Sequence, residues 1–458
     1  MAFVMTFFAM LFPTLVGFAF INLFLNKKDD AALPERLAMG FCIGLMLVTA
    51  EMFFVLTKLR IPFSIYSISI PLLPMLVAGL YVTFKNDLVT IDLSGFKSLK
   101  TIEIILLILI IAKIFFVSST LMIKPVSGWD AWQQYSFRAK AFFINKTADV
   151  PNLPETVRGQ HNALSQTWVF LCVDKWDDIL GKIPFPLYYI SLAVLFYAAV
   201  RRNRSRLISL FATYLLMSLP FLVYHATIEY CDFMLSVYLF AGVSLMFLWL
   251  NEPKLRYLIL SLVFLLSTTT IKSEAYFHIA MIMAAFVAAI FSKKLNAAFG
   301  IKRIREFSVA AILLGGAVLA RVMFFASHEA LRFHGVDASR IMPLLSAFTD
   351  YMFTRDNWNI IWLLLILLVI FNYKKLFERF NLFLLGIVSL ELSGFMAYYF
   401  LAQNDIYGWL FYVTPAVRNM LQFMPIAALL IANLLTIELP RFSFAPTKSG
   451  GTARKQKR

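Results

Sequence analysis

Residues 101–140 join two kinds of sequence that together indicate the fold: TIEIILLILIIAKIFFVSSTLMI, an apolar run, and KPVSGWDAWQQYSFRAK, a polar and aromatic segment. About 20 mostly apolar residues suffice for a helix to cross the hydrocarbon core of a bilayer, so the run over 102–121 predicts a membrane span. The following segment, 128–140, holds an acid, two bases, two tryptophans and a tyrosine within thirteen residues. Such a segment directly after a span indicates a polar site at the membrane surface.

The whole chain has the composition of a membrane protein. Of its 458 residues, 60% are hydrophobic and 15% are charged, and the mean hydropathy is +0.77. Soluble domains contain about 25% charged residues. Apolar runs recur between charged breaks, and we predict an all-α polytopic membrane protein with about thirteen transmembrane helices. The expected spans are 4–25, 37–57, 63–84, 102–121, 183–200, 206–224, 232–250, 255–271, 275–291, 307–326, 358–371, 381–402 and 415–435.

The distribution of basic residues predicts the orientation of the spans. The formal net charge is +16, and Lys and Arg fall in short clusters between apolar runs. These residues accumulate at the cytoplasmic ends of spans, so the pattern indicates topology rather than a nucleic-acid partner. With the N-terminus outside, the connections expected inside are 26–36, 85–101, 201–205, 251–254, 292–306, 372–380 and the tail. Those expected outside are 122–182, 225–231, 272–274, 327–357 and 403–414.

The chain is expected to have three regions. Residues 1–101 form three N-terminal transmembrane helices with their connection, 102–435 form a transmembrane core, and 436–458 form a basic cytoplasmic tail. The outer loop 122–182 has aromatic and apolar residues at helical spacing, which predicts amphipathic helices lying along the membrane interface. A first such helix begins near residue 128, and a second helical stretch covers 161–180.

Two acids of the predicted outer loops are candidate catalytic residues. Asp130 follows a span and lies where partial desolvation moves the pKa of a carboxyl group toward neutrality. Asp232 stands in HATIEYCDFML (225–235), ahead of another apolar run. If they converge on one cavity, the two carboxylates could accept a proton from a hydroxyl group or hold a divalent cation. The alternative is that each acid only caps a helix by accepting backbone N–H groups.

Two further segments place charge at the ends of spans. TTTIKSEAYFH (268–278) puts Lys272, Glu274 and His278 between two apolar runs, where charged groups pair or face an aqueous cavity. The alternative is an ion pair of Lys272 with Glu274 that only closes a tight turn. In TPAVRNMLQFMP (414–425), Arg418 and Gln422 are one helical turn apart, and arginine suits bidentate phosphate binding. The alternative for Arg418 is that it extends to the lipid headgroups.

Taken in order, these segments resemble the outer-face motifs of the GT-C superfamily of membrane glycosyltransferases, in particular its bacterial members related to the dolichyl-phosphate-mannose protein mannosyltransferases. GWDAWQQYSFRAKAFF (128–143) resembles their first-loop block, and EYCDFMLSVY (229–238) resembles a Tyr-Ala-Asp-Leu-Pro stretch. IKSEA (271–275) resembles a Lys-x-Glu-Gly stretch, and TPAVRNMLQFMP a Ser-x-x-x-Arg block. The chain departs from the family at a His-Pro-Asp-Tyr-Pro block, of which only His161 is retained, and in three extra spans before the shared core.

The resemblance implies a GT-C-like core and roles for individual residues. Asp130 would be the catalytic residue of the first loop and Asp232 the second catalytic acid. The cavity for the donor phosphate would be lined by Arg418, Lys272, Glu274, Lys140, His161 and Gln422. A divalent cation, Mg or Mn, could bind Asp130 and Asp232, because related enzymes divide over needing one.

The implied function is transfer of a sugar from a polyprenyl-phosphate donor to a hydroxyl group of a glycan, lipid or protein acceptor, with inversion at the sugar. The implied location is the bacterial inner membrane, with the active site facing outward and membrane lipids around it. Two alternatives are a transporter or flippase of lipid-linked sugars, and an outer-face polysaccharide polymerase or ligase. Transporters often show repeated halves or broken helices. A polymerase or ligase predicts a large outer loop late in the chain, whereas the largest loop here is early.

Overall fold

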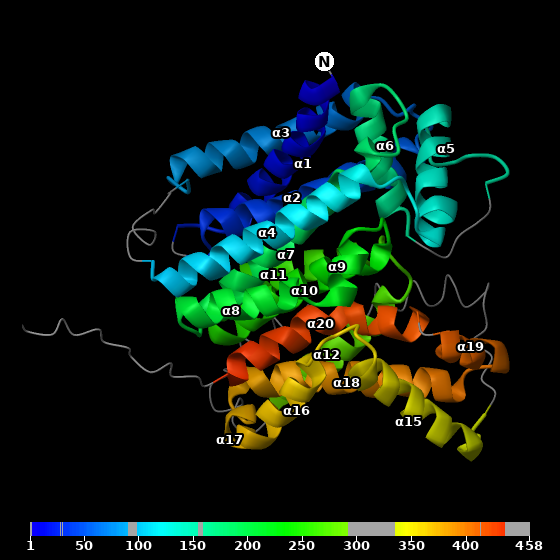
Figure 1. Ribbon diagram of the computed structural model, residues 1–458. Coiled ribbons are helices and arrows are strands. Elements are labelled where there is room, and N and C mark those ends of the chain that lie inside the picture. Colours follow the sequence, from blue (N-terminus) through cyan, green and yellow to red (C-terminus); the bar gives the residue numbers. More distant parts are fainter. Residues whose placement is uncertain are drawn as a thin grey trace, which may run out of the picture.

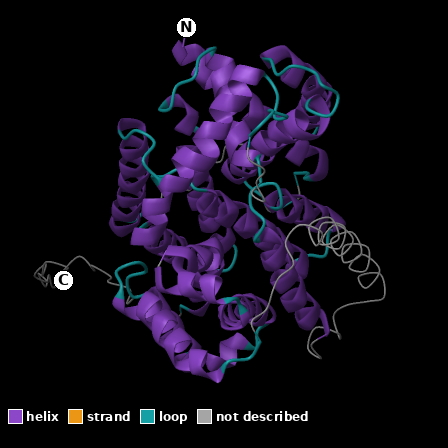
Figure 2. Cartoon of the chain, turned by 90° about the vertical axis from the view of Figure 1, so that its right-hand side faces the viewer, coloured by secondary structure: helices purple, strands orange, loops and turns teal. Residues whose placement is uncertain are grey.

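Every regular element in the described part of the chain is a helix (Figures 1 and 2). The computed structural model describes residues 2–27, 29, 31–89, 99–153, 159–291, 335–412 and 414–435. Within these ranges, eight helices are long and apolar enough to cross a membrane, and a bent pair of helices raises the number to nine. The all-α class and the coarse architecture of a polytopic membrane protein are therefore confirmed.

The helices differ in length, and only the long ones match a bilayer by themselves. The long ones are α1 (Ala2–Phe24), α2 (Leu33–Ala50) with a π-helical turn (Glu51–Leu56), α3 (Ile65–Lys85), α4 (Thr101–Ile123), α7 (Pro184–Arg201), α10 (Cys231–Asn251), α18 (Arg379–Leu401) and α20 (Thr414–Leu434). Shorter apolar helices are α8 (Arg206–Met217), α9 (Pro220–Ala226), α11 (Leu255–Thr268), α12 (Ala275–Phe291) and α16 (Ile361–Phe371). The other α-helices are α5 (Phe137–Asn145), α6 (His161–Val173), α15 (Ile341–Thr349), α17 (Tyr373–Leu376) and α19 (Asn404–Trp409).

Each predicted span within the described residues overlaps a helix, but α11, α12 and α16 are shorter than a full span and the span expected over 206–224 is broken. α8 and α9 meet at 68°. Pro220 begins α9, and Leu219 before it is extended (φ −65°, ψ 123°). A proline cannot donate the backbone hydrogen bond that would continue a helix, and it disfavours helical geometry in the residue before it. The predicted span 307–326, the connection 292–306 and the tail 436–458 lie outside the described residues.

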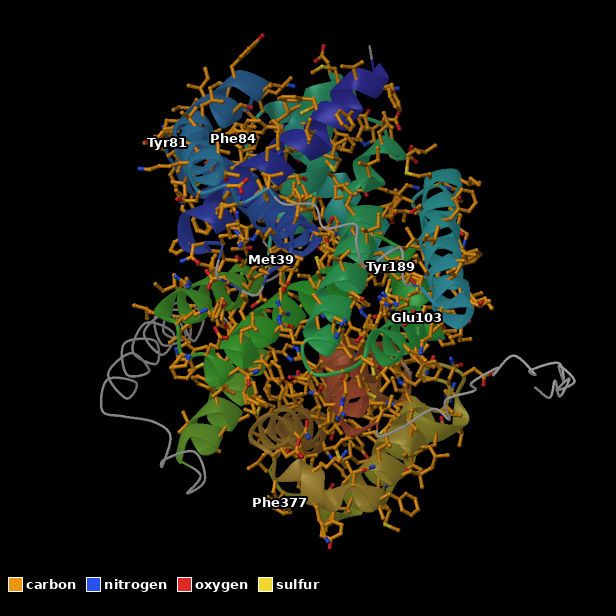
Figure 3. The ribbon with its side chains drawn as sticks, turned by 90° about the vertical axis from the view of Figure 1, so that its left-hand side faces the viewer. Met39, Tyr81, Phe84, Glu103, Tyr189 and Phe377 are labelled. Atoms are coloured by element: carbon orange, nitrogen blue, oxygen red, sulfur yellow. The ribbon has the colours of Figure 1, made fainter. Side chains whose placement is uncertain are left out.

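The core is centred on α10, whose side chains are buried along the whole helix from Cys231 to Leu250. α10 packs against α7, α11 and α20 (Figure 1). Large side chains on peripheral helices point outward instead, such as Tyr81 and Phe84 of α3, which are 63% and 74% exposed (Figure 3). A helix with an exposed apolar surface of this kind is suited to contact with lipid.

One end of the bundle gathers basic residues and is called the basic end. There Asp29 pairs with Arg256 at 2.6 Å. Glu35 pairs with Arg202 at 2.6 Å. Arg206 and Glu103 make a third pair at 2.7 Å. These contacts bring together the connection after α1 and the ends of α2, α4, α7, α8 and α11, and hold the N-terminal helices on the core.

The helices α1 and α2 approach each other backbone to backbone. A Cβ added at Gly44 would collide with the carbonyl oxygen of Pro13, and one added at Gly17 would collide with that of Gly40. Small residues permit this close approach between helices in a bilayer, where van der Waals packing drives association. Trp168 of α6 donates a hydrogen bond of 2.8 Å to the Ala9 carbonyl oxygen, so this pair also contacts the 122–182 connection.

The Gly44→Ala protein is expected to be less stable than the natural protein, because one methyl group must separate α1 from α2. Overpacking of this kind costs about 1–3 kcal/mol. Gly408→Ala is the matched control, since nothing lies within 4 Å of the position where its Cβ would be. Thermal unfolding of the purified proteins in detergent measures the effect. Equal melting temperatures of the two variants would contradict the close packing.

The 122–182 connection contains two helices with different environments. In the first, the π-helical turn Ala131–Ser136 continues into α5, with Trp132 63% exposed and Tyr135 and Phe142 buried. A helix is therefore present where the sequence predicts the first one, with aromatic side chains on both its exposed and its buried side. The second helix, α6, is buried from His161 to Cys172 and so is packed in the protein rather than lying along its surface. It ends at Val173, earlier than predicted, because Asp174 adopts a left-handed conformation (φ 54°).

Candidate functional site

Arg418 joins the two candidate catalytic acids. Its Nη1 atom lies 2.8 Å from Asp130 Oδ2, and its Nη2 atom lies 2.8 Å from Asp232 Oδ2. The Nε–H group also donates to Asp232 Oδ2, at 2.8 Å. Asp130 comes from the segment after α4, Asp232 from the first turn of α10, and Arg418 from α20. The structure thus brings together three residues that lie far apart in the sequence.

Lys272 adds a second cation to this arrangement. Its Nζ atom lies 2.9 Å from Asp232 Oδ1 and 2.7 Å from Glu274 Oε1. Gln422, one turn after Arg418 on α20, donates from Nε2 to Asp232 Oδ1 at 2.7 Å. Both oxygens of Asp232 are therefore engaged. We call the six residues Asp130, Asp232, Lys272, Glu274, Arg418 and Gln422 the ionic cluster.

The ionic cluster is buried at one side and accessible at the other. Asp232 and Gln422 are fully buried, whereas the side chains of Arg418 and Glu274 are 16% and 37% exposed. The Asp130 side chain that pairs with Arg418 is 12% exposed. The cluster also lies far from the basic end, because the 21 residues of α10 run from the first turn, which holds Asp232, toward Lys254. At 1.5 Å per residue this is about 30 Å, the thickness of a bilayer core.

The charges of Lys272 and Glu274 support each other. Burial disfavours the charged form of Lys272, but the nearby Asp232 and Glu274 carboxylates outweigh it and raise the pKa of this lysine. Burial likewise acts against the charge of Glu274, and the Lys272 ammonium outweighs it and lowers the pKa of this carboxyl group. Both groups are therefore charged at neutral pH and form an ion pair.

Tyr230 fixes the position of Asp130 and was not identified from the sequence. The backbone N–H of Asp130 donates to Tyr230 Oη at 3.3 Å, and the Arg418 guanidinium lies over the Tyr230 ring, 4.7 Å from its centre. A Cβ on Gly128 would collide with this ring. The glycine two residues before Asp130 is the sequence signal for the contact, because it leaves space for an aromatic side chain.

The structure decides between the alternatives that the sequence left open. The Asp130 side chain makes no capping hydrogen bond and pairs with Arg418 instead. Asp232 lies within the first turn of α10 rather than at its cap, which is Tyr230. Lys272 does pair with Glu274 across the turn, but it also contacts Asp232, so the pair has more than a turn-closing role. Arg418 is held by the carboxylates of Asp130 and Asp232.

Two residues that the resemblance assigned to the cavity lie elsewhere. The Nζ atom of Lys140 is 3.9 Å from the centre of the Trp176 ring. His161 contacts Thr49 through Nδ1, at 2.7 Å, and Tyr188 through Nε2, at 2.9 Å. Burial lowers the pKa of His161 to about 3, so this histidine is neutral and brings no positive charge to a phosphate. Both expectations came from the order of motifs, which does not determine the direction of a side chain.

Two buried acids near the cluster carry information that the sequence reading did not use. Burial raises the pKa of Glu229 to about 7, and its nearest cation is Lys182, with Nζ 3.9 Å from Oε1. Glu391, inside the apolar helix α18, is fully buried and lies 2.9 Å from His278 Nδ1. An acid within an apolar run is costly in a bilayer, so the position of Glu391 in the sequence indicated a buried polar contact.

The residues of the cluster do not fit a divalent cation. Calcium and magnesium take six or more oxygen ligands, and carboxylates supply most of the protein's share. Within the described residues, no group of three or more His, Cys, Asp or Glu side chains is arranged to hold a metal ion. The guanidinium of Arg418 stands between Asp130 and Asp232, where a shared Mg or Mn ion would lie. The donor set therefore favours Arg418 and Lys272 as the positive charges of the site.

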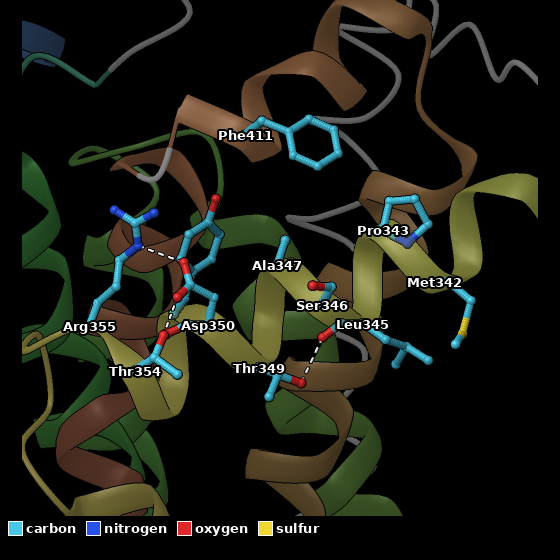
Figure 4. Close-up of a pocket in the computed structure, with 11 residues that line it drawn as sticks. Met342, Pro343, Leu345, Ser346, Ala347, Thr349, Asp350, Thr354, Arg355 and Phe411 are labelled. Atoms are coloured by element: carbon cyan, nitrogen blue, oxygen red, sulfur yellow. Dashed lines mark hydrogen bonds and ion pairs between the residues drawn. The ribbon is translucent and has the colours of Figure 1, made fainter.

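An open hollow of about 850 Å³ lies beside α15, with Phe411 on its far side (Figure 4). Its lining includes apolar side chains of α15 and an ion pair of Asp350 with Arg355 at 2.6 Å. Behind the hollow, Tyr399 packs on Phe348 of α15 and accepts a hydrogen bond of 3.4 Å from Asn419, the neighbour of Arg418. The lining of the hollow includes no residue of the ionic cluster.

No protein-family model matches this chain, and no curated protein or solved structure matches it either. The helical architecture and its apolar spans define a polytopic α-helical membrane protein. Within that class, the distinguishing feature is an ionic cluster of three carboxylates, two cations and one amide at the end of the bundle opposite to the basic end.

Proposed function

We propose that this protein is a membrane glycosyltransferase that moves a sugar from a polyprenyl-phosphate donor to an acceptor hydroxyl group. The observation that carries the proposal is the contact of Arg418 with both Asp130 and Asp232, with Lys272 on the far side of Asp232. A buried ammonium and a partly exposed guanidinium, both held by carboxylates, suit a phosphate, and an adjacent carboxylate suits a hydroxyl group that must lose its proton. The GT-C-like order of the same residues in the sequence agrees with this chemistry.

Donor binding would release the catalytic base. A phosphate group that takes the Nη1–H of Arg418 replaces Asp130, whose carboxylate then turns to the acceptor. Asp232 keeps the other edge of the guanidinium, since it contacts Nε and Nη2. The phosphate takes the place of the Asp130 carboxylate beside Nη1, so the partly buried guanidinium of Arg418 keeps a negatively charged partner.

In the transfer step, one bond to the anomeric carbon forms and one breaks. The acceptor oxygen forms a bond to the anomeric carbon while its proton moves to Asp130. The bond from that carbon to the phosphate oxygen breaks, and its electron pair leaves with the polyprenyl phosphate. Arg418 and Lys272 stabilise the charge that develops on this phosphate, and attack opposite to it inverts the sugar.

The proposed topology places this site at the outer face. Basic residues accumulate at the cytoplasmic ends of spans, so the basic end faces the cytoplasm and the ionic cluster faces outward. About thirteen spans, counted with the predicted span 307–326, give this arrangement with the N-terminus outside. The 122–182 connection then lies at the outer surface, with Trp129 and Trp132 exposed to the headgroups. A bacterial inner membrane is the location that the resemblance implies, and it is part of this proposal.

The Asp130→Asn protein is expected to lose sugar transfer by about 100-fold or more, because an amide cannot accept the proton and general-base catalysis contributes about 10²–10⁴-fold. Purified protein in nanodiscs receives a mixture of labelled polyprenyl-phosphate sugars, and release of the free carrier phosphate is measured. Asp149→Asn, an exposed acid of the same connection, is the matched control and is expected to be fully active.

The same proteins in liposomes separate an enzyme from a transporter or flippase. The fully buried Glu391 and His278 are the observation that favours the transporter, since ionisable groups inside a membrane often line a translocation path. If Asp130→Asn and the natural protein both move lipid-linked sugar across the bilayer at equal rates and neither releases carrier phosphate, the transporter is correct and the enzyme is not. Formation of sugar chains from a lipid-diphosphate donor would instead indicate a polymerase or ligase.

A further inference from the structure

Two buried side chains extend the ionic cluster into the interior of the bundle. His278 lies in the first turn of α12, and Glu391 lies near the middle of α18. The Nδ1 atom of His278 is 2.9 Å from Glu391 Oε2, and its Nε2 atom is hydrogen-bonded to Gln422 Oε1. Gln422 in turn donates to Asp232. We call Glu391, His278 and Gln422 the relay.

The acceptor-only groups at one end of the relay determine where its protons are. Asp232, between Lys272 and Arg418, is a carboxylate and only accepts hydrogen bonds. Gln422 therefore turns its amide nitrogen to Asp232 and its carbonyl oxygen to His278. A carbonyl oxygen also only accepts, so the Nε2 atom of His278 carries a proton. A second proton is shared between His278 Nδ1 and Glu391 Oε2, because two acceptors at 2.9 Å would repel each other.

The relay is buried away from water, and few charged groups lie around it. His278 and Glu391 are both 0% exposed, and the Phe395 ring lies 5.6 Å from the His278 ring. The charged groups that face His278 from the described elements packed around it are Glu391 of α18, Glu274 before α12, Asp232 of α10 through Gln422, and Arg418 one turn earlier on α20.

We propose that Glu391 and His278 are positioning residues that keep Gln422 turned toward Asp232 and so fix Arg418 in the geometry that receives the donor phosphate. The catalytic part of this inference rests on the proposed function. With Gln422 and Lys272 on Oδ1, Asp232 cannot rotate, and its Oδ2 atom holds the Nε and Nη2 edge of Arg418. Only the Nη1 edge, paired with Asp130, is left for exchange with an anion.

Loss of the proton shared by His278 and Glu391 would reverse the direction of the hydrogen bonds along the relay. Once it is gone, the remaining imidazole proton moves to Nδ1, where it meets the Glu391 carboxylate. The bare Nε2 atom then faces the Gln422 oxygen, and the amide rotates to donate to His278. Its oxygen now faces Asp232 Oδ1, so Asp232 loses one donor and gains a repulsive contact. The relay therefore makes the geometry of the cluster depend on pH through a group that does not touch the substrate.

The first test measures the proton positions directly and needs no activity. The chain has five histidines, so protein labelled with ¹⁵N-histidine in nanodiscs gives few signals, and His278→Asn identifies the one from His278. We expect a protonated Nε2 at neutral pH, and a change to a protonated Nδ1 with a bare Nε2 at high pH. A bare Nε2 at neutral pH would overturn the relay.

The second test compares two changes at Glu391 across pH. Glu391→Gln keeps the size of the side chain, and its amide donates to His278 Nδ1 and cannot lose a proton. This variant is therefore expected to lack the loss of sugar transfer at high pH that the relay causes in the natural protein. The ratio of natural to Glu391→Gln activity is expected to fall about tenfold as pH rises, since a hydrogen bond to a charged group is lost. Glu391→Leu leaves Nδ1 without its partner and is expected to be impaired at every pH.

The control is Glu51→Gln, the same change at an acid of the π-helical turn after α2, which makes none of the relay's contacts and is expected to follow the natural pH profile. Identical alkaline limbs for the natural and Glu391→Gln proteins would overturn the positioning role. If no donor gives transfer with the natural protein, the proposed function fails, and the ¹⁵N spectrum still decides the relay by itself.

Discussion

Arg418→Lys is expected to lower sugar transfer by about 100-fold or more while the protein still folds. A guanidinium presents five N–H groups in a planar fork, and Arg418 uses three of its nitrogens to contact Asp130 and Asp232 together. An ammonium group is a single point of charge that can hold one of the two carboxylates closely. The variant keeps the net charge, so loss of activity would come from lost geometry. A missing donor to a developing oxyanion costs about 10²–10³-fold in turnover.

The control for this change is Arg355→Lys. Arg355 pairs with Asp350 at 2.6 Å, but its side chain is 50% exposed and it lies on the hollow beside α15 rather than in the cluster. It is expected to be as active as the natural protein. Turnover and donor affinity are measured for both variants with the labelled donor. An Arg418→Lys protein with more than half of the natural turnover would show that bridging of the two acids is not needed.

The sequence identified the charged residues of the cluster because charge is rare in this chain. An acid or a base between apolar runs is costly in a membrane, so Asp130, Asp232, Lys272 and Arg418 each stood out alone. The alternation of spans and the positions of basic residues also predicted that these four residues lie at the same end of the helical bundle. The sequence could not give the contacts, such as Arg418 between two acids, because these depend on which faces of distant helices meet.

The failures of the sequence reading have a common physical cause. His161 and Lys140 were assigned to the cavity by their place in the order of motifs, but the packing of α6 and Trp176 directs them elsewhere. The helix α6 is buried on every side from His161 to Cys172 by neighbours that come from distant parts of the chain. Glu391 was passed over although it stands in an apolar run, because its partner His278 is more than 100 residues away and the sequence does not show that they meet.

The ionic cluster is also expected to set the stability of the bundle, and a charge-balance experiment tests this. Asp232→Asn leaves Lys272 and Arg418 buried without their shared carboxylate, and removal of one partner from a buried ion pair costs about 3–5 kcal/mol. Lys272→Met removes one of the two cations. The double variant Asp232→Asn with Lys272→Met restores the natural balance of charge. It is expected to be more stable than the sum of the single effects predicts, by about 1–3 kcal/mol.

The readouts of this double-mutant cycle separate folding from chemistry. Thermal unfolding in detergent gives the stability of each protein, and transfer of the labelled sugar gives its activity. Asp87→Asn, which breaks an exposed pair with Lys27, is the control and is expected to change neither. All three cluster variants are expected to be inactive, although the double variant is folded. The two variants with Asp232→Asn lack the carboxylate that fixes the edge of Arg418, and Lys272→Met lacks one of the two cations that would stabilise the leaving phosphate. Additive stabilities would mean that Asp232 and Lys272 do not act as a pair. An active double variant would mean that the anchoring of Arg418 by Asp232 is not what prepares the site for the donor.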